Sequence, residues 1–121
     1  MRAYLALSIE EVRDFYAKKS FNPEIVYAPT IKFITENPEL DEEEAEYEIS
    51  MIAARNSGGY VIALEIPEKQ ITQHFEESVE LNSNIVWENV EALFVYDSVD
   101  DELTWYATQE IIDFLSTAGA K

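Results

Sequence analysis

The chain has no cysteine and few basic residues. Without cysteine it can form neither a disulfide nor a zinc site with thiolate ligands, and this composition is typical of a reducing compartment. Only 8 Lys and Arg side chains stand against 25 Asp and Glu, so the 121 residues carry a formal net charge of -17. Because carboxylates repel phosphate groups, we expect the protein to bind neither nucleic acid nor a membrane surface directly.

Long hydrophobic runs are also missing. No segment approaches the roughly eighteen apolar residues that a membrane-spanning helix requires. The apolar run at residues 3–7 leads into Glu10 and Glu11, unlike the longer apolar segment of a signal peptide. We therefore expect a cytoplasmic protein. Its 47% hydrophobic residues, including 7 Tyr, 6 Phe and 2 Trp, suffice for a core, so residues 1–121 are expected to form a single globular domain.

Two capping boxes predict helices. In this motif the side chain at the helix start accepts a bond from the third residue's N–H, and the Glu at that third position bonds back. Residues 8–11 (Ser-Ile-Glu-Glu) predict a helix that ends at Asn-Pro 22–23. Residues 41–44 (Asp-Glu-Glu-Glu) predict a longer helix that ends at Ser-Gly-Gly 57–59.

Short apolar runs predict the strands. Residues 60–64 and 92–96 are almost unbroken in apolar character, which is typical of strands covered on both faces. Residues 79–86 alternate between apolar and polar side chains, which predicts a strand near an edge. The remaining expectations are strands at 3–7 and 25–28, a brief helix capped by Thr30, and a polar, irregular segment at 68–77.

The C-terminal part of the chain predicts a final helix. Residues 97–101 offer several N-cap side chains, and apolar residues follow at helical spacing: Leu103, Ala107, Ile111, Phe114 and Ala118. The expected order of elements is β-α-β-α-α-β-β-β-α, without an internal repeat. The most economical fold is α+β, a two-layer arrangement in which helices pack on one face of a mostly antiparallel sheet.

The densest acidic segment lies at the start of the second capped helix. Residues 41–44 are explained by the positive end of the helix dipole, which favours carboxylates in the first turn. Glu46 and Glu48 lie further along the helix, where added negative charge repels its neighbours. We therefore expect Glu43, Glu46 and Glu48 to form a surface for a basic protein partner, with a solvated helix surface as the alternative.

Four acidic residues near the C-terminal end could ligate a hard cation. Asp97, Asp100, Asp101 and Glu102 offer the carboxylate oxygens that Ca²⁺ and Mg²⁺ prefer, but they lack the ligand spacing and turn glycine of an EF-hand loop. Helix capping explains the same residues adequately. We therefore assign neither a metal site nor a cofactor.

His74 is the one histidine of the chain. It could form an acid–base pair with Glu76 or Glu77, because its ordinary pKa lies near neutrality. A histidine exposed in a polar loop is the alternative, since neither a nucleophile nor a phosphate-binding loop accompanies it. We therefore assign no catalytic residue.

The two tryptophans have different expected roles. Trp87 lies at the end of a strand and is expected at the edge of the core. Trp105 lies beside the buried stripe of the predicted final helix, where Tyr106 and Ile112 widen the apolar face. Such a wide face favours an exposed contact surface, so Trp105 is a candidate partner-binding residue.

Three segments resemble an uncharacterised family of small bacterial proteins, mainly actinobacterial. They are residues 1–4, which open a strand, residues 41–54, which begin Asp-Glu-Glu-Glu-Ala-Glu-Tyr, and residues 86–90 before the run 92–97. Family members are richer in Ala, Val and Arg and have a longer connection where this chain has residues 56–59. The family has no assigned function, so the resemblance implies a single small cytoplasmic domain and carries over no active site.

Three functional hypotheses remain open on the sequence. The first is a non-enzymatic interaction module that binds a basic protein through Glu43, Glu46, Glu48 and Trp105. The second is a DNA mimic, whose carboxylates imitate phosphates and occupy the basic groove of a nucleic-acid-binding protein. The third, from a different class, is a divalent-metal-dependent enzyme that uses the acidic residues of 97–102.

Overall fold

The computed structural model describes residues 1–23 and 25–119. Within them, no helix has both the length and the apolar character needed to cross a membrane. Three short 3₁₀ turns lie at Glu68–Gln70, Trp87–Asn89 and Thr108–Glu110. The helices are α1 (Ile9–Lys18), α2 (Ile31–Glu36), α3 (Glu42–Arg55) and α4 (Ile111–Gly119). The strands are β1 (Arg2–Leu7), β2 (Ser20–Phe21), β3 (Ile25–Tyr27), β4 (Tyr60–Glu65), β5 (Ile71–His74), β6 (Ser78–Leu81), β7 (Ile85–Val86), β8 (Val90–Asp97) and β9 (Glu102–Ala107).

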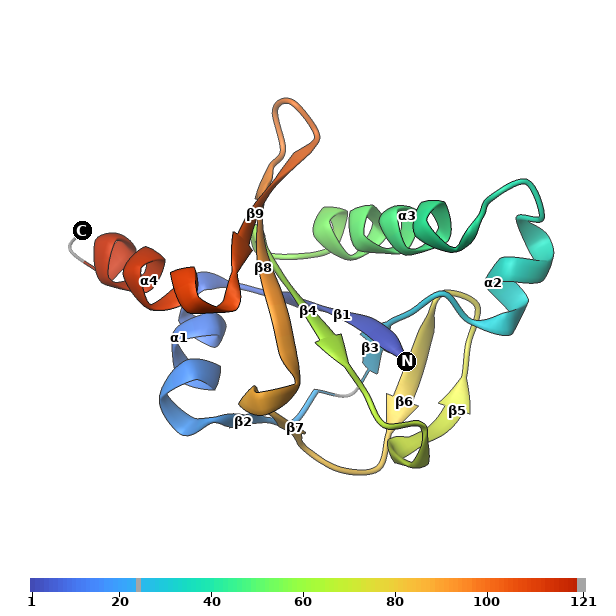
Figure 1. Cartoon of the computed structure of the whole chain (residues 1–121), viewed down its shortest axis with the longest axis horizontal. Helices are drawn as coiled ribbons and strands as arrows, with labels where there is room; N and C mark the ends of the chain where they lie inside the picture. The colour runs from blue at the N-terminus through green and yellow to red at the C-terminus, as the bar shows by residue number, and fades with distance from the viewer. Residues whose placement is uncertain (24, 120–121) are drawn as a thin grey trace.

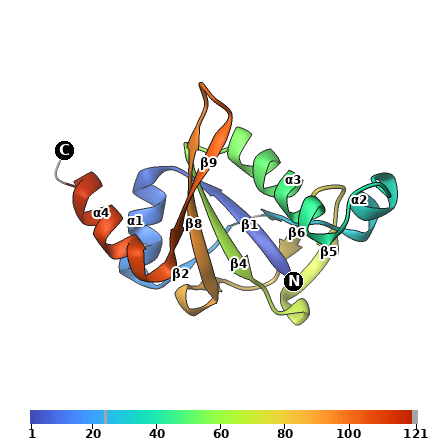
Figure 2. The same ribbon diagram turned by 45° about the horizontal axis from the view of Figure 1, so that its top comes forward.

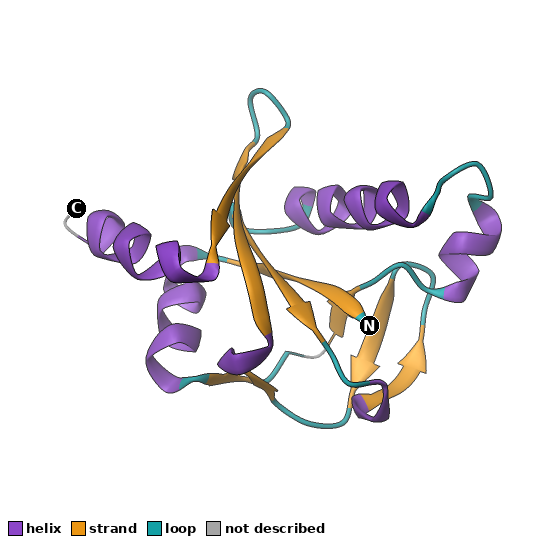
Figure 3. Ribbon diagram, in the orientation of Figure 1, coloured by secondary structure: helices purple, strands orange, loops and turns teal. Residues whose placement is uncertain are grey.

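A seven-stranded antiparallel sheet organises the structure (Figures 1 and 3). Its strand order is β5-β6-β3-β1-β4-β8-β9, and every neighbouring pair is antiparallel. A separate pair, β2 with β7, joins the end of α1 to the segment before β8. The α+β class and the mostly antiparallel sheet are thereby confirmed.

The helices are divided between the two faces of the sheet (Figure 2). α3 packs on one face, where Ile49 and Ala53 meet Val61 and Ala63 of β4. This layer agrees with the prediction that helices pack on a face of the sheet. On the opposite face, α1 and α4 form a second layer, in which Phe15 and Ile111 belong to the same buried cluster as Ile62 and Leu64. The physical reason is the unbroken apolar character of β4 and β8, whose two faces must both be kept from water.

Both predicted capping boxes are present. At the start of α1, the Ser8 hydroxyl accepts a hydrogen bond from the Glu11 N–H at 3.2 Å, and the Glu11 carboxylate accepts from the Ser8 N–H at 2.9 Å. At the start of α3, Asp41 and Glu44 make the same reciprocal bonds at 2.8 and 3.1 Å. Thr30 caps α2 as predicted. Local side-chain chemistry thus fixes where three of the helices begin.

The prediction of the final helix is wrong for its first half. Residues 102–107 form β9, which makes a hairpin with β8, and α4 begins only at Ile111. The Asp97 carboxylate accepts bonds from the N–H groups of Val99 and Asp100, and Asp101 has a left-handed φ of 54°, so residues 97–101 form a turn instead of a helix cap. Thr, Trp and Tyr at 104–106 also favour a strand. The side chain of Ala118, which was predicted on the buried stripe, is outside the part of the chain whose side chains are described.

Two further segments differ from the prediction. The polar stretch 68–77 contains the edge strand β5, whose exposed residues lack the apolar alternation by which strands are recognised. The predicted strand 79–86 is divided into β6 and β7 by a turn at 82–84. Trp87 is half-buried against the core as predicted, with its ring 5.0 Å from that of Phe15 in an edge-to-face arrangement.

Ile49 provides a test of the packing of α3 on the sheet. Its side chain is fully buried, so Ile49→Ala should lower the free energy of unfolding by about 2–5 kcal/mol, measured by urea denaturation. Glu48→Ala, at the exposed neighbouring position of the same helix, is the control and should change it by no more than about 0.5 kcal/mol. Equal stability of the two variants would contradict this packing.

Candidate functional site

A shallow groove lies on the α3 face of the sheet, between α3 and the β8–β9 hairpin. Its volume is about 340 Å³. The side chain of Trp105 is 59% exposed on the β9 side, and Glu46 of α3 is on the other side. We call this feature the Trp105 groove; it is lined by Arg2, Tyr4, Glu46, Ala63, Glu91, Ala92, Phe94 and Trp105.

The sheet register forms the floor of the Trp105 groove. Tyr4 of β1 lies opposite Ala63 of β4, which lies opposite Ala92 of β8. In the next row, Phe94 lies opposite Trp105. Ala63 and Ala92 have smaller side chains than Tyr4, Phe94 and Trp105 around them. The surface is therefore lower over the two alanines. The groove therefore results from a particular sequence of large and small side chains across four strands.

A β-bulge directs Glu91 into the groove. Leu64 pairs with Val90, whereas the preceding residue Ala63 pairs with Ala92, so Glu91 is an extra residue in β8. Its carbonyl accepts a hydrogen bond from the Thr108 hydroxyl at 2.9 Å. Bulges commonly re-aim side chains next to functional sites. Here the bulge places a carboxylate within a strand that is otherwise mostly apolar.

Burial changes the acid–base properties of the groove. It is the main reason that the pKa of Tyr4 is raised to about 12, and the negative charge of Glu46 adds to the effect. Burial also raises the pKa of Glu46, against the influence of Arg2, which favours its charged form. The groove therefore combines a buried phenol with a carboxyl group that lies beside a guanidinium.

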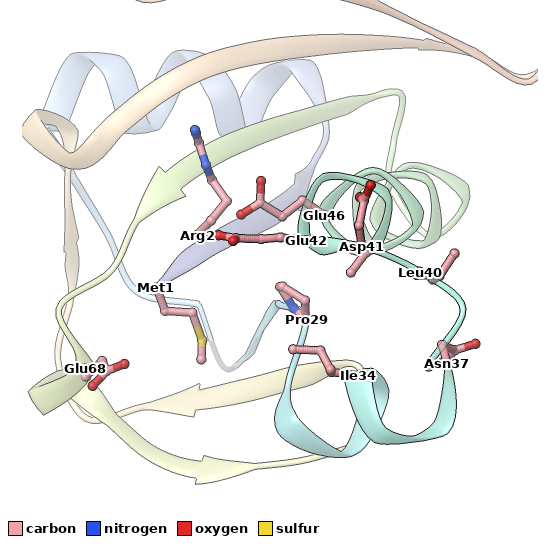
Figure 4. A pocket seen from close by; sticks show the side chains of 11 residues that line it. Met1, Arg2, Pro29, Ile34, Asn37, Leu40, Asp41, Glu42, Glu46 and Glu68 are labelled. Atoms are coloured by element: carbon pink, nitrogen blue, oxygen red, sulfur yellow. The ribbon is translucent and has the colours of Figure 1, made fainter.

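Two hollows adjoin the Trp105 groove at Arg2 and Glu46. One, of about 400 Å³, lies between α2, α3 and the start of β1; Figure 4 shows Arg2, Glu42 and Glu46 together at one side, with Met1, Pro29 and Ile34 nearby. The other, of about 550 Å³, is lined by Met1, Arg2, Glu42, Glu43, Glu46 and Glu65. The concave surface around Arg2 is therefore rich in carboxylates, and Arg2 supplies a single guanidinium among them.

The structure brings together part of the predicted partner surface. Glu46 and Trp105 line the same groove, and Glu43 lines an adjoining hollow. Glu48 lines a different hollow, with Glu36 and Glu39 among its neighbours. The prediction for Trp105 was wrong about its element, because it lies on a strand instead of a helix, but its exposure is as expected.

Sequence reasoning missed Arg2, Tyr4 and Glu91 as groove residues. The one signal for Glu91 was an acidic residue between Val90 and Ala92, immediately before an apolar run. Tyr4 and Arg2 carried no such signal, because their place in the groove depends on the strand order. Their contribution can be found only from the pairing of β1 with β4 and β8.

The four candidate metal ligands lie in or beside the β8–β9 turn. Arg55 donates to both carboxylate oxygens of Asp101, at 3.2 and 2.8 Å, and the Tyr96 hydroxyl donates to the same group at 2.6 Å. Asp100 and Glu102 are exposed. Within residues 1–23 and 25–119, no three Asp, Glu, His or Cys residues are grouped so as to hold a metal ion. The geometry instead makes Asp101 the link between the hairpin and the last turn of α3.

His74 is exposed at the end of the edge strand β5. The carboxylate of Glu76 is engaged by the Lys32 ammonium group at 3.1 Å. His74 itself pairs with Val79 in the sheet register, and its candidate partner Glu76 contacts α2.

Comparison with known proteins gives one match. The sequence model of a family described as Family of unknown function (DUF6912) matches residues 1–101. This confirms the resemblance to a family without assigned function, while the bacterial distribution stays a prediction. The matched residues end at Asp101, before β9. Comparisons with curated proteins and with solved structures gave no match.

The Asp101 contacts generate a pH prediction. Hydrogen bonds from Arg55 and Tyr96 lower the pKa of Asp101 from 3.8 to about 2. Because the folded-state pKa is depressed, the stabilisation should be fully present above about pH 4 and lost as the pH falls through about 2. Arg55→Gln should raise the pKa of Asp101 toward 3.8, measured by NMR titration of its carboxyl carbon.

The control for this titration is Lys18→Gln. Lys18 pairs with Asp14 at 3.1 Å on α1, so its loss removes one positive charge without touching the hairpin. It should leave the Asp101 titration unchanged. A pKa of Asp101 that stays near 2 in Arg55→Gln would show that the guanidinium is not its cause.

Proposed function

We infer that this chain, which belongs to the Family of unknown function (DUF6912), is a non-enzymatic binding module that holds a basic segment of another protein in the Trp105 groove. The observation that best supports this is the meeting of Trp105 and Glu46 in one groove. Trp105 offers an exposed aromatic face, and Glu46 and Glu91 offer carboxylates. Arginine and lysine side chains suit this combination, because their cation stacks on an indole ring and pairs with a carboxylate.

The surroundings of the groove favour the same kind of partner. Glu42, Glu43 and Glu65 line the adjoining hollow, and the net charge of the chain is -17. A field of this sign speeds the approach of a positively charged partner and disfavours a negatively charged one. The surface of the module is therefore the Trp105 groove together with Glu43, and Glu48 lies outside it.

Affinity capture from a native cell lysate tests this function. Wild-type protein should retain a basic partner at low salt and release it at high salt, because screening weakens the attraction between exposed charges. Trp105→Ala and Glu46→Lys should each abolish most of the capture. Loss of a central interface side chain typically costs about 2 kcal/mol or more, roughly thirtyfold in affinity. Retained proteins are quantified by mass spectrometry.

Glu48→Lys is the matched control for Glu46→Lys. It makes the same charge change on the same helix, but at a position that lines a different hollow. It should retain the partner, so equal loss in both variants would mean that only the total charge matters. A captured set that is identical for wild type, Trp105→Ala and Glu46→Lys would overturn the proposed function. Release of the partner by duplex DNA would instead favour the DNA-mimic hypothesis.

A further inference from the structure

The two edges of the large sheet differ in how they are protected. The β5 edge is short and polar, and its register with β6 shifts between Ile71 and Gln73. The β9 edge is longer, and its pairing with β8 runs from Ala92 opposite Ala107 to Asp97 opposite Glu102 without a shift. Bulges and short length are common ways in which proteins blunt a sheet edge. They are present in β5 and absent from β9.

The sequence of β9 also lacks the usual protective residues. Glu-Leu-Thr-Trp-Tyr-Ala contains neither proline nor lysine, and its one charged residue, Glu102, lies next to the turn. Thr104 and Trp105 are exposed. Among the described residues β9 has a strand neighbour on one side only. The tip of the β8–β9 hairpin projects from the body in both views (Figures 1 and 2).

We propose that an extended basic segment of the partner pairs with β9 and adds a further strand to the sheet. This deepens the proposed function and rests on it, because side chains of the same segment would reach over β9 into the Trp105 groove. In an antiparallel or parallel addition, alternate side chains of the new strand fall on the α3 face, beside Trp105. Backbone bonds to β9 would then supply affinity, and Trp105 would select an arginine or lysine.

Charge decides which chain can occupy the edge. A second copy of this protein would bring another net charge of -17 against the first, so pairing between two β9 edges is opposed by repulsion. A basic segment has the opposite charge and meets Glu46 and Glu91 at the groove. The occupant is therefore an extended, positively charged segment of a different protein.

The test uses a short peptide of alternating arginine and threonine as the probe. Hydrogen exchange of the wild-type protein is followed by NMR with and without the peptide. Within residues 102–106, the alternate N–H groups that do not bond to β8 should exchange fast in the free protein and become protected in the complex; the N–H of Ala107 is left out because it donates to the Glu110 carboxylate at 2.9 Å. The same peptide with every threonine in the d-configuration has equal charge but cannot form a regular strand, and it should bind roughly tenfold more weakly.

Variants of the hairpin complete the test. Trp105→Ala should weaken binding of the peptide, whereas Val99→Ala should not, because Val99 is 90% exposed at the hairpin tip outside the groove. Binding that perturbs Trp105 without protecting any β9 amide would overturn strand addition and leave the proposed function standing. Equal affinity for the two peptides would also overturn it. Absence of binding by the all-l peptide would overturn strand addition, and lysate capture would then decide the proposed function separately.

Discussion

The apolar character of β4 on both of its faces is the constraint on which the rest of the structure depends. Residues 61–64 are at most 1% exposed, so each side of the strand must be covered by other elements. α3 covers one side by packing on β1, β3 and β4, while α1 and α4 cover the other. Because α3 lies over the middle of the sheet, Trp105 at the β9 end keeps an exposed face. The groove is thus a consequence of how the core is closed.

The acidic residues of α1, α3 and β8 differ in their roles. Some stabilise helix starts: Glu11 and Glu44 complete capping boxes, and Glu42 and Glu43 lie in the first turn of α3. Others have no such role in a helix start. Glu46 is half-buried beside Arg2, and Glu91 is held in a bulge. A high net charge destabilises a compact state through self-repulsion. Glu46 and Glu91, which stabilise no helix start, are therefore the first carboxylates to consider for function.

The sequence was informative where local chemistry decides the structure. Both capping boxes and the strands at 3–7, 25–28, 60–64 and 92–96 could be predicted, because caps and apolar runs act over a few residues. The segment 102–107 was misread as helix because its apolar residues also fit helical spacing. Strand order, the bulge at Glu91 and the meeting of Glu46 with Trp105 depend on contacts between distant segments. Individual site residues could be proposed from the sequence, but not the groove that joins them.

The bulge in β8 also changes which residues of the strand point to each side of the sheet. Without it, Val90 and Ala92 would share a face; with it, Val90 joins the α1–α4 cluster and Ala92 joins the α3 cluster. Trp87 is fixed against Phe15 before the bulge, and Phe94 is fixed opposite Trp105 after it. Adding or removing one residue between Trp87 and Phe94 would turn the side chains on one side of the change to the opposite face of the sheet. In evolution, this stretch should therefore keep a constant length even where its residue types vary freely.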